Sequence, residues 1–283
     1  MRYEKKKRGK VGTCNLCLNN GPLSWDHVPP KGGIELTPVQ MERIFDVFAI
    51  NRDKKALKES QNGVKFRTIC STCNSFLGTN YDPVLNKFAQ DIGMFVNSVI
   101  GFPEYINIKT KPKLLIKAIL AHLVASKKEV DGTVLDRQIR NIIFDIEAPI
   151  PDSINIFYWL YHYNTTVIMR DFSMPAKRGH FGNGSGIFNL IKYFPIGYLI
   201  SDLTEYEGLD NLTKFKNFRS DSEIEIPVNL RRVEHPYWPE LVDDGNFLLT
   251  SSATQSGISA TPRRKISTNR TVTVSRGKPQ NER

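Results

Sequence analysis

The sequence CNLC at residues 14–17 and the sequence CSTCN at residues 70–74 together hold all four cysteines of this 283-residue chain. Each contains a C-x-x-C turn, which presents two thiolates from one tight knuckle, and two knuckles complete a tetrahedral zinc site. A site with four sulfur ligands has no open coordination position, so its role is structural. We therefore expect Cys14, Cys17, Cys70 and Cys73 to bind one structural Zn²⁺ ion.

This zinc ion would join two remote segments, because 52 residues separate Cys17 from Cys70. Closing such a loop costs chain entropy, and zinc binding of this kind supplies on the order of 10 kcal/mol toward folding. The alternatives are a redox dithiol and two unrelated cysteine pairs. A redox C-x-x-C is expected near a βαβ pattern, which the sequence lacks, and without a secretion signal disulfides are disfavoured.

An Asp-His dipeptide lies between the knuckles, in the sequence WDHVPP at residues 25–30. Consecutive residues of a regular strand point to opposite faces, so Asp26 and His27 would diverge in the middle of a strand. The two prolines end strand pairing directly after them. We therefore expect the dipeptide at a strand end, where the backbone can redirect both side chains. An isolated Asp-His is usually a surface ion pair, but here the zinc site would hold it in place.

Asn74 follows the last cysteine directly, so the zinc ion would fix its backbone as well. A carboxylate oxygen from Asp26 and an amide oxygen from Asn74 suit a hard cation such as Mg²⁺ or Mn²⁺, which keeps several waters and takes further ligands from phosphate. A histidine that is neutral near pH 7 can deprotonate an attacking water. The sequence thus predicts a second, catalytic metal beside His27.

This order of residues resembles the HNH (ββα-metal) endonuclease superfamily, in particular the four-cysteine zinc members related to phage endonuclease VII. One bacterial branch continues with Leu-Gly and an Asp, as in Leu77-Gly78 and Asp82, and has a Gly-Gly like Gly32-Gly33. The resemblance covers about residues 13–85 and rests on several spaced elements. It implies that the four cysteines bind zinc, that Asp26 and Asn74 bind the catalytic metal, and that His27 is the general base. The implied reaction is hydrolysis of phosphodiester bonds, leaving 5′-phosphate and 3′-hydroxyl ends.

Some residues depart from the pattern of this family. The segment between the dipeptide and the second knuckle is long, and no partner that orients His27 can be assigned. Asn62 could be the family's middle asparagine, but an Asn before Gly63 is better interpreted as a turn residue. Asp82 could contact metal, although a helix cap also accounts for it. His122 shares a helix face with apolar residues, so we interpret it as a core or groove histidine rather than a ligand.

The fold class expected from these patterns is α+β, with a zinc-stabilised ββα-metal HNH domain followed by a second α+β domain. Residues 1–12 are a basic flexible tail, and 13–105 are the nuclease domain, with a helical insertion at about 38–58 and a docking helix that begins at Asp82. Residues 110–245 form the second domain, and 246–283 form a disordered basic tail. Within the second domain we expect helices at 113–125 and 135–144 and strands at 154–161, 166–169, 196–200 and 224–228.

The net charge of +10 comes from the two ends of the chain, because residues 13–262 carry 26 Lys/Arg and 27 Asp/Glu. Inside this range residues 13–128 have 15 basic and 9 acidic side chains, whereas 129–262 have 11 and 18. We therefore expect nucleic acid, with DNA favoured, at the first half, and a protein partner at the acidic second domain. No signal peptide or membrane span is predicted, so a cytoplasmic protein without membrane contact is expected.

Two other functions compete with a nuclease. The first is a non-catalytic, zinc-stabilised nucleic-acid-binding or adaptor protein, which would have no need of the intact set of Asp26, His27 and Asn74. The second is a structural zinc domain that joins protein partners and has no affinity for DNA. The resemblance, and only the resemblance, points to mobile elements or bacterial antiviral defence as the biological setting.

Overall fold

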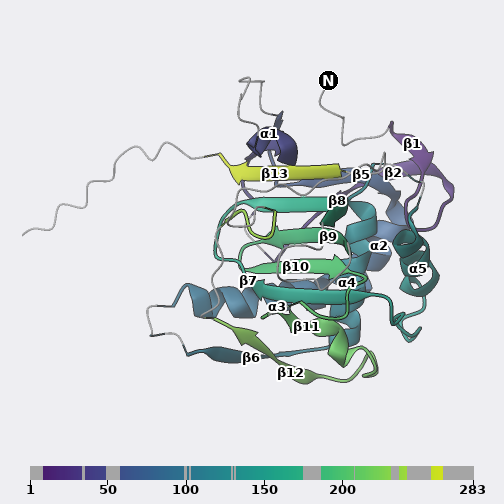
Figure 1. The fold of residues 1–283 in the computed structure, drawn as a ribbon. Coiled ribbons are helices and arrows are strands. Elements are labelled where there is room, and N and C mark those ends of the chain that lie inside the picture. The colour runs from purple at the N-terminus through teal and green to yellow at the C-terminus, as the bar shows by residue number, and fades with distance from the viewer. Residues whose placement is uncertain are drawn as a thin grey trace, which may run out of the picture.

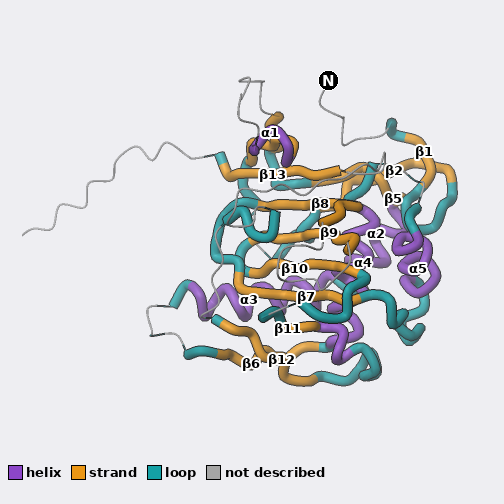
Figure 2. The backbone as a smooth tube through the Cα atoms, in the orientation of Figure 1, coloured by secondary structure: helices purple, strands orange, loops and turns teal. Residues whose placement is uncertain are grey.

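The computed structural model describes residues 9–33, 36–48, 58–98, 101, 103–128, 130, 132–174, 186–206, 208–230, 236–240 and 256–263. Helices and extensive sheets are mixed along the chain, which confirms the α+β class. The strands form three sheets, and Figure 2 shows helices α3 and α4 behind the largest of them. None of the helices in the described ranges is both long and apolar enough to cross a membrane.

The smallest unit around the cysteines is a strand–strand–helix arrangement. Strands β1 (Val11–Thr13), β2 (Asn20–His27) and β5 (Lys65–Cys70) form an antiparallel sheet in the order β1-β2-β5. Helix α2 (Ser71–Asn80) follows β5 without a break, because Cys70 is its N-cap and accepts a hydrogen bond from the Cys73 N–H. The segments on either side of the long insertion therefore meet in one compact unit.

An eight-stranded sheet forms the centre of the molecule, in the order β11-β7-β10-β9-β8-β13-β3-β4. The strands of this sheet are β3 (Val39–Arg43), β4 (Lys58–Ser60), β7 (Asn155–Leu160), β8 (Thr166–Met174), β9 (Gly186–Tyr193), β10 (Ile196–Ser201), β11 (Asp210–Asn211) and β13 (Ser256–Pro262). Every residue of β7 and β10 is buried, so both faces of the sheet are covered. Gly197 lies opposite Trp159 on the neighbouring strand, where a Cβ atom would approach the indole ring to 2.5 Å.

The helices pack on the face of the sheet that carries Ile156, Tyr158 and Tyr198. They are α3 (Asp82–Val96), α4 (Pro112–Ala125) and α5 (Val134–Ile143), and a two-stranded sheet of β6 (Tyr105–Thr110) and β12 (Ile224–Asn229) lies beyond α3. A short helix α1 (Ile44–Phe48) and a 3₁₀ turn at Leu212–Phe215 complete the elements. Nearly every residue of α4 is buried, so this helix is the central one rather than an amphipathic surface helix.

The structure confirms the helices expected at 113–125 and 135–144 and the four expected strands of the second domain, with β8 extending further than predicted. It corrects the helical insertion in part, because residues 39–43 and 58–60 are strands and, among its described residues, only 44–48 are helical, while 49–57 lie outside the described residues. It also corrects the disordered tail, because residues 256–262 form strand β13 between β8 and β3. Residues 1–8, 246–255 and 264–283 of the expected tails lie outside the described residues, while residues 11–13 form β1.

These strands cross the domain boundaries drawn from the sequence. β3 and β4 come from the expected nuclease domain and β13 from the expected tail, yet all three belong to the sheet built mainly by residues 155–201. The expected helix at Asp82 is present, with Pro83 in its first turn, but its N-cap is Tyr81 rather than Asp82. The carboxylate of Asp82 is therefore available for another contact.

Candidate metal centre and catalytic pocket

The four cysteine sulfurs form one cluster in which all ligand atoms lie within 4.8 Å of one another. None of the four is in a disulfide, and Sγ of Cys17 lies 3.9 Å from Sγ of Cys70. Four sulfurs at 2.3 Å from a tetrahedral zinc ion are separated by about 3.8 Å, so the cluster fits zinc. The geometry could hold such a metal, as the sequence predicted.

The backbone around this cluster is arranged to stabilise thiolates. The N–H of Cys70 donates to Sγ of Cys14 at 3.3 Å, and the N–H of Cys73 donates to Sγ of Cys70 at 3.5 Å. A hydrogen bond from the Cys73 side chain, joined by backbone N–H groups, lowers the pKa of Cys14, while the same bond and burial raise the pKa of Cys73. Metal ligation requires the deprotonated thiol, so it is the backbone N–H groups that favour the ligating form.

The first knuckle is also docked on helix α4. The side chain of Asn15 is buried and donates to the carbonyl oxygens of Val124 at 2.9 Å and Lys127 at 2.6 Å, at the C-terminal end of α4. The hydroxyl of Thr68 on β5 donates to the carbonyl of Ala125 at 2.5 Å. Both side chains thereby satisfy carbonyls in the last turn of α4, which have no partner inside the helix, and Asn15 also satisfies the carbonyl of Lys127 just beyond it. The cysteine unit is therefore fixed to the centre of the molecule.

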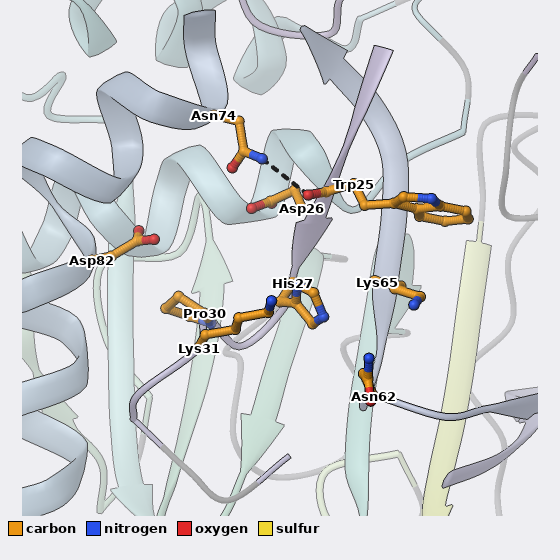
Figure 3. A pocket seen from close by; sticks show the side chains of 9 residues that line it. All are labelled: Trp25, Asp26, His27, Pro30, Lys31, Asn62, Lys65, Asn74 and Asp82. Carbon is orange, nitrogen blue, oxygen red and sulfur yellow. Dashed lines mark hydrogen bonds between the residues drawn. The ribbon is translucent and has the colours of Figure 1, made fainter. Parts of the chain in front are cut away.

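Asp26 and His27 are the last two residues of β2, as expected from the prolines that follow. A β-bulge between Ser24 and Trp25 shifts the register just before them, and bulges re-aim side chains. Both residues line a cavity of about 390 Å³, together with Trp25, Pro30, Lys31, Asn62, Lys65, Asn74 and Asp82 (Figure 3). The structure thus brings the three expected catalytic residues Asp26, His27 and Asn74 to one cavity, which lies beside the cysteine cluster because α2 supplies both Cys73 and Asn74.

Asn74 is held by its amide nitrogen. Nδ2 donates to the carbonyl oxygen of Trp25 at 2.9 Å and to Oγ of Ser24 at 3.2 Å. Figure 3 shows the amide oxygen turned away from Trp25. These two bonds fix the amide orientation, so the oxygen that a hard cation requires is directed away from the strand.

Asp26 is almost fully buried, with 3% of its surface exposed, and it contacts a histidine 96 positions further along the chain. Nδ1 of His122 lies 3.1 Å from Oδ2 of Asp26, and Nε2 of the same ring lies 2.9 Å from Oδ1 of Asp82. Burial alone would lower the pKa of His122, but the charges of Asp26 and Asp82 raise it to about 10. The ring is therefore a cation that donates to both carboxylates.

The structure confirms that His122 is a core histidine and corrects the interpretation of Asp82 as a helix cap. His122 is buried, as expected of a core histidine, but it holds two residues of the cavity in place rather than packing passively. Asp82 is not a helix cap, because its carboxylate bonds to His122 and lines the cavity. The sequence signal for this role of His122 was its place inside a helix that is otherwise strongly apolar. A polar ring that is buried in such a helix requires hydrogen-bond partners.

His27 is half-buried, and its Nε2 atom has no hydrogen-bond partner among the residues that the structure describes. Burial lowers the pKa of His27, and the positive charges of Lys31 and Lys65 act in the same direction. The charge of Asp26 and a hydrogen bond to the backbone of Asn62 oppose this shift. A lowered pKa keeps the ring neutral near pH 7, which is the state that accepts a proton.

The backbone of Asn62 lies near the ring of His27, and Asn62 lines the same cavity. Asn62 precedes Gly63, which has a φ of +63° and would place a Cβ atom 2.9 Å from Leu36. Glycine is suited to this conformation and to this close approach. The turn interpretation of Asn62 is consistent with this geometry, and the turn brings its backbone to the ring of His27.

No family model matches this chain, and comparisons with curated proteins and with solved structures gave no match either. The functional argument therefore rests on the cysteine cluster and on the cavity beside it.

Proposed function

We propose that this protein is a metal-dependent endonuclease of the HNH type that hydrolyses phosphodiester bonds, with DNA as the favoured substrate. The observation that carries the proposal is the convergence of Asp26, His27 and Asn74 on one cavity beside a four-cysteine cluster. A protein that only binds nucleic acid has no need for a histidine with an unpartnered nitrogen beside two oxygen donors.

The donor set fits a hard divalent cation. Asp26 offers a buried carboxylate, and Asn74 offers an amide oxygen whose orientation is fixed by the bonds of its Nδ2 atom. Asp82 contributes a second carboxylate to the same cavity. Oxygen ligands of this kind hold Mg²⁺ or Mn²⁺. When bound, such an ion stabilises negative charge on the phosphate and on the leaving oxygen.

The residues of the chain then have distinct roles. His27, which lines the cavity, accepts a proton from the attacking water. His122 positions the carboxylates of Asp26 and Asp82. The cysteine cluster, as a zinc site, fixes the backbone of Asn74 relative to β2.

The test is nicking of supercoiled plasmid by the purified, zinc-loaded protein. We expect nicking with Mg²⁺ or Mn²⁺, loss of nicking when EDTA is added, and recovery when excess Mg²⁺ is restored. His27→Ala should abolish activity, whereas the exposed His162→Ala, on a segment that does not line the cavity, should leave it unchanged. A His27→Ala protein that cleaves as fast as the wild type would refute the assigned base.

A further inference from the structure

One face of the β2–β5 strand pair carries a group of aromatic and cationic side chains next to the cavity. Trp25 lies opposite Arg67, and His27 lies opposite Lys65. Because side chains alternate along a strand, these four share one face. Asp26 and Phe66 form the intervening pair, and both are buried on the other face.

The indole of Trp25 holds the two cations in position. Nζ of Lys65 lies 5.4 Å and Cζ of Arg67 lies 4.4 Å from its ring centroid. These are cation–π distances, and such a contact orients a cation without neutralising its charge. Lys31 adds a third positive charge at the rim of the cavity, where Trp25 and Lys65 also lie (Figure 3).

None of these three cations has an ion-pair partner in the part of the chain that the structure describes. Other basic side chains do have carboxylate partners. Lys87 pairs with Asp91 at 2.6 Å, and Lys109 pairs with Glu223 at 3.0 Å. Three uncompensated cations beside a cavity attract an anion. Lys65 and Arg67 lie two residues apart on β5 and Lys31 lies beyond the end of β2, so their spread suits a chain of anions better than a single one.

We infer that Lys31, Lys65 and Arg67, here called the cationic strip, bind the sugar-phosphate backbone of a nucleic acid next to the phosphate that is cleaved. The inference rests on the proposed function, because the strip borders its cavity. Trp25 serves as the platform that aims Lys65 and Arg67 rather than as a base-stacking residue. Contacts of this kind position the nucleic acid and carry no direct sequence information.

The experiment measures binding separately from cleavage. The full-length, zinc-loaded His27→Ala protein is the parent, and fluorescence anisotropy is recorded without added Mg²⁺ on three probes of one sequence: duplex DNA, single-stranded DNA and single-stranded RNA. The variant adds Lys65→Gln and Arg67→Gln, which keep long side chains against Trp25 and remove both charges. The matched control adds Lys109→Gln, on the β6–β12 sheet at the other end of the molecule (Figure 1).

For the preferred probe we expect the double substitution to raise Kd by about tenfold and to reduce the slope of log K against log salt concentration. Two lost phosphate contacts lower this slope by about 1.8 on duplex DNA and by about 1.4 on a single strand. The control should leave both quantities unchanged. The probe with the largest difference identifies the substrate as DNA or RNA, and a second, unrelated sequence should show the same loss.

Equal Kd and slope for parent and double variant on all three probes would overturn the inference, as would a parent that binds none of them. Circular dichroism and zinc content verify that the double variant is folded. Lys31→Glu, at an exposed residue, provides an independent variant that should also raise Kd.

If the wild-type protein binds through the strip but never nicks plasmid, the proposed nuclease function fails and the binding inference stands. If the wild-type protein nicks plasmid but the double substitution leaves binding unaltered, the binding inference fails and the nuclease function stands.

Discussion

Nδ1 of His122 lies 3.1 Å from Oδ2 of Asp26, although the two residues are 96 positions apart in the chain. The other nitrogen of the ring reaches Asp82, so one buried side chain of the central helix α4 holds two acidic residues of the candidate catalytic cavity. Asn15 of the first cysteine knuckle bonds to the end of the same helix. α4 thus positions both the cysteine cluster and the cavity.

The first prediction concerns this positioning role. His122→Phe keeps a planar ring but removes both hydrogen bonds, so the carboxylates of Asp26 and Asp82 lose their orientation. Residues that orient metal ligands typically contribute 10- to 100-fold to metal affinity or activity, and we expect a loss of about that size. The measurements are Mn²⁺ affinity by calorimetry, and kcat and KM on plasmid DNA. The loss should fall on kcat and on Mn²⁺ affinity, with zinc content unchanged.

Lys117→Met is the matched control for His122→Phe. Lys117 is buried on the same helix and donates to the carbonyls of Ile142 and Asp145, away from the cavity. Both substitutions should lower thermal stability, because each disturbs a buried polar group. Only His122→Phe should weaken Mn²⁺ binding. If both variants lose Mn²⁺ affinity equally, His122 has a purely structural role.

The second prediction concerns the cysteine cluster. Cys73→Ser should eliminate stoichiometric zinc and unfold the unit of β1, β2, β5 and α2, since zinc supplies on the order of 10 kcal/mol and whole domains have only about 5 to 15. Elemental analysis should find one zinc ion per wild-type chain, and thermal unfolding should shift downward in the variant. A zinc-free wild-type chain with an unaltered melting temperature would contradict the structural role.

The convergence of the four cysteines, and of Asp26, His27 and Asn74 on one cavity, was predictable because its signal is local. The C-x-x-C spacing fixes two sulfurs at a time, and Asn74 and the Asp26-His27 dipeptide are tied to the knuckles by short stretches of chain. The roles of His122 and Asp82 depend on packing between elements 40 residues apart, which no short pattern encodes. The placement of these residues was therefore predictable from short stretches of sequence, whereas the contacts of His122 with Asp26 and Asp82 were not.

The predictions for the insertion and for the C-terminal segment were wrong for a related reason. Residues 39–43 form a strand because they pair with residues 258–262. Without that distant partner the apolar residues matched a helical period loosely, and Ser256–Pro262 looked like part of a polar tail. Strand propensity depends strongly on neighbours. Long-range pairing overrode the local pattern at both places, and it also joined segments assigned to separate domains.

The third prediction concerns a buried charge cluster at the start of α5. Asp136 accepts from Lys127 at 3.0 Å and from Arg170 at 2.5 Å, and all three side chains are almost fully buried. Burial alone would raise the pKa of Asp136, but the charges of Arg170 and Lys127 lower it from 3.8 to about 2. Because the folded pKa is the lower one, this carboxylate stabilises the fold above about pH 4. That contribution, about 2 kcal/mol, is lost as the pH falls through 2.

Urea unfolding at intervals between pH 5 and pH 2 measures this contribution. Asp136→Asn should be less stable at pH 5 by about 3 kcal/mol, since it leaves the buried cations Lys127 and Arg170 with Asp171 as their remaining carboxylate partner. Its stability should also fall less steeply than that of the wild type between pH 4 and pH 2. Parallel pH profiles for the two proteins would show that Asp136 is not the titrating group.

The last prediction separates the two functions of Asn74, which offers an oxygen to the cavity and donates from Nδ2 to Trp25. Asn74→Ala removes both, so Mn²⁺ affinity and cleavage should fall by more than about 100-fold, beyond the range typical of residues that only orient ligands. Asn74→Asp keeps an oxygen donor but replaces the Trp25 hydrogen bond with repulsion between a carboxylate and a carbonyl. It should therefore retain more Mn²⁺ affinity than Asn74→Ala while losing about 1 kcal/mol or more of stability. If Asn74→Asp and Asn74→Ala bind Mn²⁺ equally weakly, the amide orientation matters more than the oxygen, and direct ligation by Asn74 is wrong.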